Sequence, residues 1–267
     1  MTHPTQTRRG ERGFTLVELA IVLVIIGLLI GGVLQGRQMI ANAQLTRTAA
    51  DIDAFDAAFS NFYDMFGGIP GDIANSTQRI PNCAAAPCLT PAAGAGNGRL
   101  EQAPGAVKPA NSEAMAAWHQ LSNVDLISAD FQVGNGTNGY GAGLPKAPIG
   151  GGSIGFEVGS TVTGAASDFP GLISLAGGPT TMQVGQYLVI KGSAGAVVTA
   201  APPAAALTPK EAEIIDRKRD DGSPASGSVR GFGGTGKANC ATAAAAGSFY
   251  NSANSAPLCG IYVRMSS

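Results

Sequence analysis

The chain has 267 residues, a formal net charge of -1 and only 13% charged residues, and its length allows one or two domains. This near-neutral balance argues against a protein that coats nucleic acid, which would carry a strongly basic stripe. Glycine and proline are abundant, with 38 and 16 residues. Apolar residues are concentrated near the N-terminus, and the remainder is rich in alanine, glycine, serine and threonine. This unevenness predicts a membrane-linked segment followed by a polar domain with many loops.

The N-terminal segment changes character abruptly at Phe14. Residues 1–13 are polar and basic, whereas no side chain between Leu19 and Leu34 carries a charge or a hydrogen-bonding group. An apolar stretch of about 20 residues can cross a bilayer as a helix, and basic residues before it favour a cytoplasmic N-terminus. A secretory signal peptide is disfavoured, because its apolar core would be shorter and a small-residue cleavage site would follow. A plain membrane anchor is the other alternative.

One acid, Glu18, lies inside this apolar segment. An unpaired carboxylate in hydrocarbon costs at least a few kcal/mol, so an acid at such a place is a candidate functional residue. Its least costly partner is a cation at the same depth. A free amino group at residue 14, in the same chain or in a neighbouring one, would supply that cation.

The sequence Gly13-Phe14-Thr15-Leu16-Val17-Glu18-Leu19 resembles the class III signal of type IV pilins and type II secretion pseudopilins. In that family a prepilin peptidase cuts after the glycine, and the new N-terminal phenylalanine is N-methylated. The resemblance implies cleavage between Gly13 and Phe14 and methylation of Phe14. It also implies that Glu18 is required for assembly, because it pairs with the N-terminus of a neighbouring subunit.

The resemblance further implies an organisation, a location and a set of partners. We expect a leader at 1–13, a transmembrane and assembly segment at 14–36, and a periplasmic or extracellular globular domain at 37–267. The implied location is the bacterial inner membrane, crossed once, and then a filament. The implied partners are prepilin peptidase, other pilin or pseudopilin subunits, an inner-membrane assembly platform and the lipid bilayer. No nucleic acid is predicted.

A single long helix is predicted from Phe14 to Phe66, because no proline interrupts this range. Beyond Arg37 the pattern becomes amphipathic, with apolar residues at helical spacing on one face: Leu45, Ala49, Ile52, Phe55, Phe59, Phe62 and Phe66. Glycines and Pro70 then predict the end of the helix. The apolar face is expected to pack on a sheet of the same chain.

The membrane half of this helix contains four glycines: Gly27, Gly31, Gly32 and Gly36. Their spacing allows two helices to approach closely in a membrane. The alternative is that glycine is simply frequent in transmembrane helices.

The fold class expected for the whole chain is α+β and pilin-like. One long helix would pack on a mainly antiparallel sheet with long Gly/Ala/Ser-rich loops, and residues 70–110 would be irregular. Strands are expected at 153–162, at 186–198 and in the C-terminal run 258–265. Two more helices are expected, one at 112–127 and one that starts at the capping box Thr208-Pro209-Lys210-Glu211 and ends near Gly222. Trp118 should anchor the packing, and His119 should be a surface or a satisfied residue.

A dense charge cluster, DRKRDD at 216–221, ends the last of these helices. The favoured interpretation is a solvated helix end with internal ion pairs. A second is a calcium site formed by Asp216, Asp220 and Asp221, since calcium takes several oxygen ligands. The pattern is not that of an EF-hand, because Lys218 stands where an acid is needed. A third interpretation, an anionic partner for the basic residues, is the weakest.

Four cysteines follow the membrane segment, at Cys83, Cys88, Cys240 and Cys259. An even number beyond a membrane segment is typical of a periplasmic domain with disulfides. Three pairings are possible, and proximity favours Cys83–Cys88 with Cys240–Cys259. A zinc site is disfavoured, because the spacings match no zinc pattern.

No motif of a known enzyme class occurs, so a structural role is predicted, with no cofactor apart from the possible calcium. The first hypothesis is a subunit of a type IV pilus. The second is a type II secretion pseudopilin or a minor pilin. The third is a membrane-anchored binding module that does not polymerise.

Overall fold

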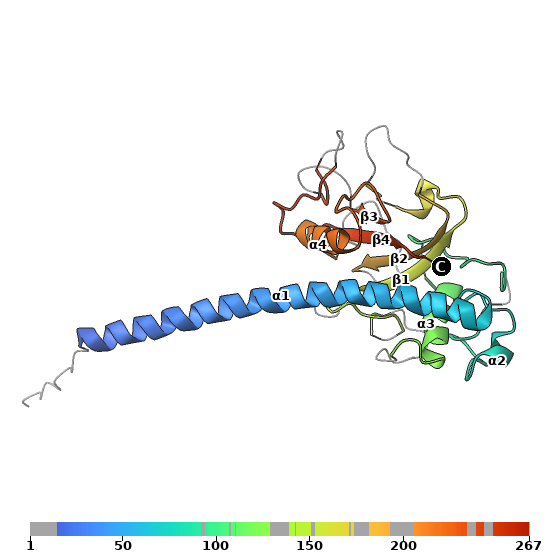
Figure 1. Cartoon of the computed structure of the whole chain (residues 1–267), viewed down its shortest axis with the longest axis horizontal. Helices are drawn as coiled ribbons and strands as arrows, with labels where there is room; N and C mark the ends of the chain where they lie inside the picture. Colours follow the sequence, from blue (N-terminus) through green and yellow to red (C-terminus); the bar gives the residue numbers. More distant parts are fainter. Residues whose placement is uncertain are drawn as a thin grey trace, which may run out of the picture. The chain divides into compact units, whose positions relative to one another are not determined.

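The structure is a computed structural model that describes residues 15–91, 94–106, 108–109, 111–128, 139–141, 143–150, 153–170, 172–173, 182–192, 206–233, 239–242 and 248–266. Contacts divide the chain into two units, Met1–Ala43 and Gln44–Ser267. Helix α1, Leu16–Phe66, contributes residues to both units (Figure 1). The predicted long helix is therefore confirmed from Leu16 onward.

In the first unit, α1 is apolar on all sides between Leu19 and Leu34. Its large side chains are exposed from Leu16, at 87%, as far as Ile40. Within the described part of the chain, α1 is the one helix long and apolar enough to cross a membrane. A helix that is apolar all round is stable only where lipid or protein covers it. Among the described residues no side chain covers it, so we expect lipid or another protein chain to do so.

In the second unit, α1 is amphipathic and buries one face. Leu45, Ile52, Phe59 and Phe62 are buried in the core, as the apolar spacing predicts. The ring of Phe55 packs edge-on against Trp118 and Phe156, each with centroids 5.0 Å apart. These contacts confirm both the apolar face and the anchoring role of Trp118.

The core of the second unit is a four-stranded antiparallel sheet, so the predicted α+β fold class is confirmed. Its strands are β1 (Gly155–Thr161), β2 (Gly185–Lys191), β3 (Val229–Phe232) and β4 (Gly260–Arg264), in the order β1-β2-β4-β3. Strand β3 is absent from the sequence prediction, because four residues with an internal glycine carry little pattern. The predicted strand at 186–198 ends at Lys191, and residues 193–200 lie outside the described ones.

Successive side chains along each strand point to opposite sides of the sheet, so its two faces carry different residues. One face contributes apolar residues to the core shared with α1: Phe156, Val158, Leu188, Ile190, Ile261 and Val263. The other face carries Tyr187, Val189 and Tyr262, which pack with Phe169, Met182 and Phe232 in a second, smaller cluster. The register places charged residues on this second face as well: Glu157, Lys191, Arg230 and Arg264.

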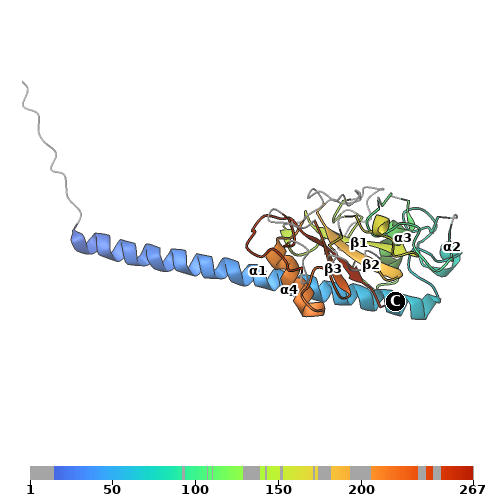
Figure 2. The same ribbon diagram turned by 90° about the horizontal axis from the view of Figure 1, so that it is seen from above.

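The remaining helices are α2 (Ser76–Arg79), α3 (Glu113–Asn123), the 3-10 helix η2 (Ala166–Asp168) and α4 (Pro209–Arg219). In both views α2 lies beside the C-terminal end of α1 (Figures 1 and 2), where Arg79 donates a hydrogen bond to the Phe66 carbonyl. The capping box predicted for α4 is confirmed, since Thr208 and Glu211 exchange their hydrogen bonds. Helix α3 is buried on all sides between Glu113 and Ser122, which the amphipathic spacing did not predict.

A glycine-rich turn in the predicted irregular tract is ordered by one acid. The carboxylate of Asp72 accepts hydrogen bonds from the backbone N–H groups of Gly96, Asn97 and Gly98, at 2.6, 3.1 and 2.6 Å. Gly96 and Gly98 have φ values of 80° and 81°, which residues with a side chain rarely adopt. Glycine is therefore required here, because the chain must turn its N–H groups toward one carboxylate.

Candidate assembly site at the N-terminal helix

Glu18 lies in the first turn of α1 and closes a capping box with Thr15. The backbone N–H and the hydroxyl of Thr15 donate to Glu18 Oε2, at 2.9 and 2.8 Å. In return the Glu18 N–H donates to Thr15 Oγ1 at 3.3 Å. This exchange satisfies two donors that an α-helix otherwise leaves unpaired at its start.

The capping box is a role that the sequence analysis missed. Its signal is present as Thr15-Leu16-Val17-Glu18, an S/T-x-x-E pattern directly before an apolar run. Glu18 therefore has a local structural function in addition to the predicted assembly function. Any test of assembly must separate these two functions.

The surroundings of Glu18 contain no compensating charge in the described part of the chain. No basic group among the described residues forms an ion pair with its carboxylate, and the neighbouring Leu16, Val17 and Leu19 are apolar and exposed. The predicted processing residues Gly13 and Phe14 lie outside the described residues, so cleavage and methylation remain predictions. Among the described residues, Thr15 is thus the one hydrogen-bond partner of this carboxylate.

The four glycines of the first unit have no packing partner among the described residues. A Cβ atom added at Gly27, Gly31, Gly32 or Gly36 would meet no described atom within 4 Å. Each glycine in a helix interior costs about 1 kcal/mol relative to alanine. No intrachain contact in the described structure offsets this cost, which favours a contact outside the chain.

Residues 8–34 match the family model of the prokaryotic N-terminal methylation motif. This motif is the signal of type IV pilins and pseudopilins, and the matched segment contains Gly13, Phe14 and Glu18. It implies processing by prepilin peptidase and assembly with other pilin subunits, and together with the long apolar helix it fits a protein anchored in the inner membrane. No curated protein and no solved structure matches the chain.

The four cysteines form two disulfides in the second unit. Cys83 is bonded to Cys88 and Cys240 to Cys259, which joins the partners that lie closest in the sequence. The second disulfide connects the segment at 239–242 to the residue that precedes β4. Both sulfur pairs belong to the main core cluster.

The charge cluster at the end of α4 differs from the predicted solvated helix end. One predicted internal ion pair is present, between Arg217 and Glu213 at 2.7 Å. Arg219 instead pairs with Asp53 and Asp56 of α1, the latter at 2.7 Å. Asp216 is fully buried, so the prediction of a solvent-facing residue was wrong for this position, because the helix turns it toward the core and Tyr250.

The three acids of the predicted calcium site do lie together. One carboxylate oxygen from each of Asp216, Asp220 and Asp221 lies within 4.8 Å of the others. Each carboxylate also accepts hydrogen bonds from the protein, for example from Tyr250 Oη to Asp216 at 2.8 Å and from Val229 N to Asp220 at 3.1 Å. These hydrogen bonds give the cluster a structural role, because Asp220 connects the end of α4 to the start of β3. Calcium binding remains a prediction.

Asp216 makes the stability of the fold depend on pH. Burial, only partly offset by the hydrogen bonds from Tyr250 and Gly222, raises the pKa of Asp216 to about 7. The unfolded carboxyl ionises near pH 4, so the folded state holds the extra proton and loses stability as the pH rises from about 4 to about 7, by at most about 1.4 kcal/mol per unit. Asp216→Asn should reduce the change in the free energy of unfolding between about pH 5 and about pH 8, as measured by urea unfolding at each pH.

The control for this prediction is Asp220→Asn, at a neighbouring acid whose oxygen accepts two backbone hydrogen bonds. It should lower stability across this pH range and flatten the slope of stability against pH much less than Asp216→Asn does, because burial, and not the charge of Asp220, is the main cause of the raised pKa of Asp216. Glu113 contributes a slope of the same sign, because burial raises its pKa to about 7. Asp216→Asn should therefore remove only part of the pH dependence, and an unchanged slope would contradict the assignment.

His119 is neither at the surface nor satisfied, which corrects the sequence prediction. It is 1% exposed on α3, and neither ring nitrogen has a hydrogen-bond partner among the described residues. Burial lowers the pKa of His119 to about 4, so the ring is neutral at physiological pH. The prediction failed because it assumed one exposed face on α3.

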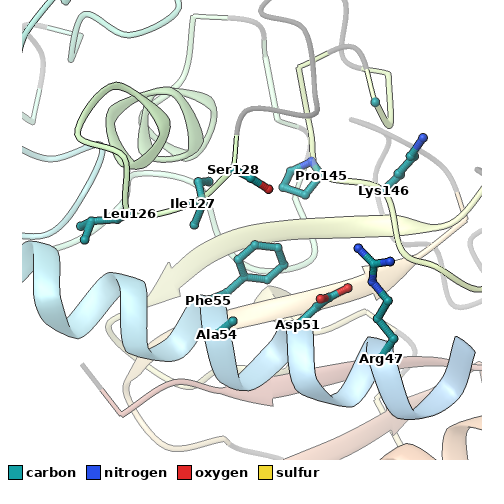
Figure 3. Close-up of a pocket in the computed structure, with 10 residues that line it drawn as sticks. Arg47, Asp51, Ala54, Phe55, Leu126, Ile127, Ser128, Pro145 and Lys146 are labelled. Atoms are coloured by element: carbon teal, nitrogen blue, oxygen red, sulfur yellow. The ribbon is translucent and has the colours of Figure 1, made fainter. Parts of the chain in front are cut away.

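A cavity of about 280 Å³ lies between the second half of α1 and the segments after α3 and before β1. Figure 3 shows Arg47, Asp51 and Phe55 reaching into it from α1, with Lys146 and Ile127 on the opposite side. Burial raises the pKa of Asp51, and Arg47 partly offsets this effect. Of the residues named in the sequence analysis, Phe55 of the apolar helix face lines this cavity, and none of the predicted site residues does.

Proposed function

We propose that this protein is a subunit of a type IV pilus. In this proposal prepilin peptidase cuts between Gly13 and Phe14, the new terminus is methylated, and subunits assemble through the first half of α1 into a filament. The match of residues 8–34 to the methylation motif supports the assignment of the N-terminal signal to type IV pilins and pseudopilins. The observation that carries the proposal is Glu18, an acid on an otherwise apolar helix with no ion-pair partner among the described residues.

The energetic argument concerns the cost of that acid in lipid. A charge in the hydrocarbon region is unfavourable by several kcal/mol unless a partner compensates it. The α-amino group created at Phe14 by cleavage is a cation near the depth of Glu18. If it comes from a neighbouring subunit, the ion pair sets the axial register between two helices and provides a driving force for leaving the lipid.

The exposed first half of α1 is suited to this exchange of lipid for protein. Its apolar side chains have no cover within the described chain, and its glycines have no neighbour within 4 Å. Small residues let helices approach closely, which increases dispersion contacts between them. Sister helices in a filament core would provide both the cover and the close contact.

A type II secretion pseudopilin or a minor pilin is the alternative function. The motif does not distinguish these roles, and we favour a pilus subunit because the chain after residue 13 is long for a major pseudopilin and has two disulfides. Gene neighbourhood separates the two: retraction ATPase and adhesin genes favour a pilus, and a secretin operon favours secretion. A membrane-anchored module that does not polymerise is the remaining hypothesis.

Glu18 substitutions test the proposal and separate charge from capping. Glutamine can still complete a capping box, so Glu18→Gln keeps the cap and removes the charge. We expect Glu18→Gln and Glu18→Ala to reduce incorporation into sheared filaments by about tenfold or more, because a lost ion pair in a membrane exceeds the 1.4 kcal/mol that a factor of ten requires. Thr15→Val, which removes the hydroxyl of the cap and keeps the charge, should assemble nearly normally.

Mass spectrometry of the membrane fraction provides the control for these variants. Each should begin at Phe14 with one added methyl group, which shows that processing and membrane insertion are intact. Normal assembly of Glu18→Gln would refute the charge-pairing role and favour either a purely capping role or a subunit that does not polymerise. An unprocessed Met1 terminus in cells with active peptidase would refute the proposal as a whole.

A further inference from the structure

A pocket of about 480 Å³ opens on the second face of the sheet. Its volume lies within the range of about 300–1,000 Å³ typical of small-molecule sites. Strands β2, β3 and β4 and the segments beside them supply its lining: Met182, Gln183, Tyr187, Gly227, Ser228, Arg230 and Arg264. Among the described residues, this lining contains two arginines and no acid.

Arg230 is the inner of the two arginines. It belongs to β3, pairs with Tyr262 of β4 and is 8% exposed. Its Nη2 donates to the Ile173 carbonyl at 3.0 Å, which fixes the guanidinium. Its Nε is buried and has no hydrogen-bond partner among the described residues. Each buried N–H donor of a guanidinium that lacks an acceptor is energetically costly. A ligand that accepts a hydrogen bond from Nε would remove this cost.

Arg264 is the outer arginine, at the end of β4. It lies opposite Tyr187 of β2 and is exposed. Its side chain forms no ion pair with any described residue. A Cβ added at Gly185 would lie 3.7 Å from Arg264 Nε, so the guanidinium extends along a position that lacks a side chain.

The acids nearest this pair, among the described residues, already have partners. Asp53 and Asp56 of α1 line a neighbouring pocket together with Arg264, but both form ion pairs with Arg219. Asp221 acts electrostatically on Arg230, yet its two oxygens already accept from Ser223 N and Ser226 Oγ, at 2.8 and 2.6 Å. Burial lowers the pKa of Arg230, as expected for a cation without full compensation. Outside the described residues, the sequence has only two further acidic side chains, Glu11 and Asp130.

We propose that this pocket binds a phosphate monoester, with its dianionic group held between Arg230 and Arg264. Guanidinium groups match the oxygens of phosphate with paired N–H donors, and two of them balance a charge of about -2. Met182 and the ring of Tyr187 provide apolar surface for the organic part of the ester. A carboxylate would balance only one of the two charges. This binding function is separate from the proposed filament assembly and does not depend on it.

The test measures binding to the full-length chain in nonionic detergent at about pH 8, where phosphate monoesters are dianions. Glycerol 3-phosphate is titrated calorimetrically at constant ionic strength, with acetate as the monoanionic comparison. We expect saturable binding of glycerol 3-phosphate that is at least about tenfold tighter than that of acetate, and Arg264→Gln should weaken it about tenfold. Arg264→Lys should bind with intermediate affinity, because it keeps the charge and loses the paired donors.

Arg217→Gln is the matched control, since Arg217 is an exposed arginine of α4 that does not line the pocket. It should leave binding unchanged. Arg230→Gln should abolish binding if the variant keeps the circular dichroism spectrum of the parent. If it fails to fold, the Arg264 variants decide the question alone.

A short-chain phosphatidic acid in the same micelles distinguishes a lipid headgroup from a soluble ester. Binding of either compound that is weakened by Arg264→Gln supports the phosphate chemistry. The compound that binds more tightly identifies the source, a soluble ester or a lipid headgroup. The proposal is overturned if neither compound binds at millimolar concentration, if acetate binds as tightly, or if Arg264→Gln binds like the parent.

Discussion

Lys191→Met should lower the free energy of unfolding by about 3 kcal/mol, because it removes the ion-pair partner of a buried carboxylate. The buried Lys108 also acts electrostatically on this carboxylate, which keeps the loss at the lower end of the range for a broken buried pair. Lys191 Nζ lies 3.0 Å from Glu157 Oε2, and both side chains are completely buried on the second face of the sheet. Tyr140 Oη donates to the other oxygen of Glu157 at 3.2 Å. Removal of one partner from such a pair costs far more than the pair contributes as a whole.

The double variant Glu157→Leu/Lys191→Met separates these two quantities. It removes both charges together, and the neighbouring Lys108, whose pKa burial already lowers to about 7, can lose its proton, so most of the stability should return, to within about 1–2 kcal/mol of the parent. Chemical unfolding of the full chain in detergent, followed by circular dichroism, measures all of these variants. A Lys191→Met variant as stable as the parent would contradict the pair's burial, and so would a double variant that is as unstable as the single one.

Trp118→Ala should destabilise the second unit by about 3–5 kcal/mol, the usual cost of removing a large buried aromatic side chain. Trp118 is completely buried on α3, and its ring packs edge-on against Phe55 and Phe59 of α1, with centroids 5.0 and 6.0 Å apart. The substitution leaves a cavity between the two helices. It also removes two aromatic contacts that link them.

Trp118→Phe should cost much less, because it keeps an aromatic ring and the indole Nε1 has no hydrogen-bond partner among the described residues. Met65→Ala is the matched control on the exposed side of α1 and should change stability by less than about 0.5 kcal/mol. Circular dichroism must follow the unfolding, since Trp118 is the chain's single tryptophan. Equal losses for Trp118→Ala and Met65→Ala would contradict the packing role.

The elements that the sequence predicted well are those with a long or local signal. The long helix follows from an uninterrupted range without proline, and its core face follows from the spacing of Leu45, Ile52, Phe59 and Phe62. The cap of α4 follows from four consecutive residues. Such features depend on neighbours along the chain, so their physical cause can be read in the order of the residues.

The misjudged features depend on partners distant in the sequence. Strand β3 is held by pairing with β4, and its own residues carry little strand pattern. His119 and Asp216 are buried because other segments cover them, and Glu157 meets Lys191 only because β1 and β2 pair in one register. A pattern of a few residues contains no information on which distant segment will cover it.

By itself the sequence determined the signal at Gly13, Phe14 and Glu18 and the apolar helix behind it, because a motif and a run of hydrophobic residues are local properties. Tertiary structure alone decided that Arg230 and Arg264 share one pocket whose described lining contains no acid, and that α3 is buried all round. The physical reason is that burial and charge compensation are set by strand register and by packing between distant segments, which the linear order of residues does not specify.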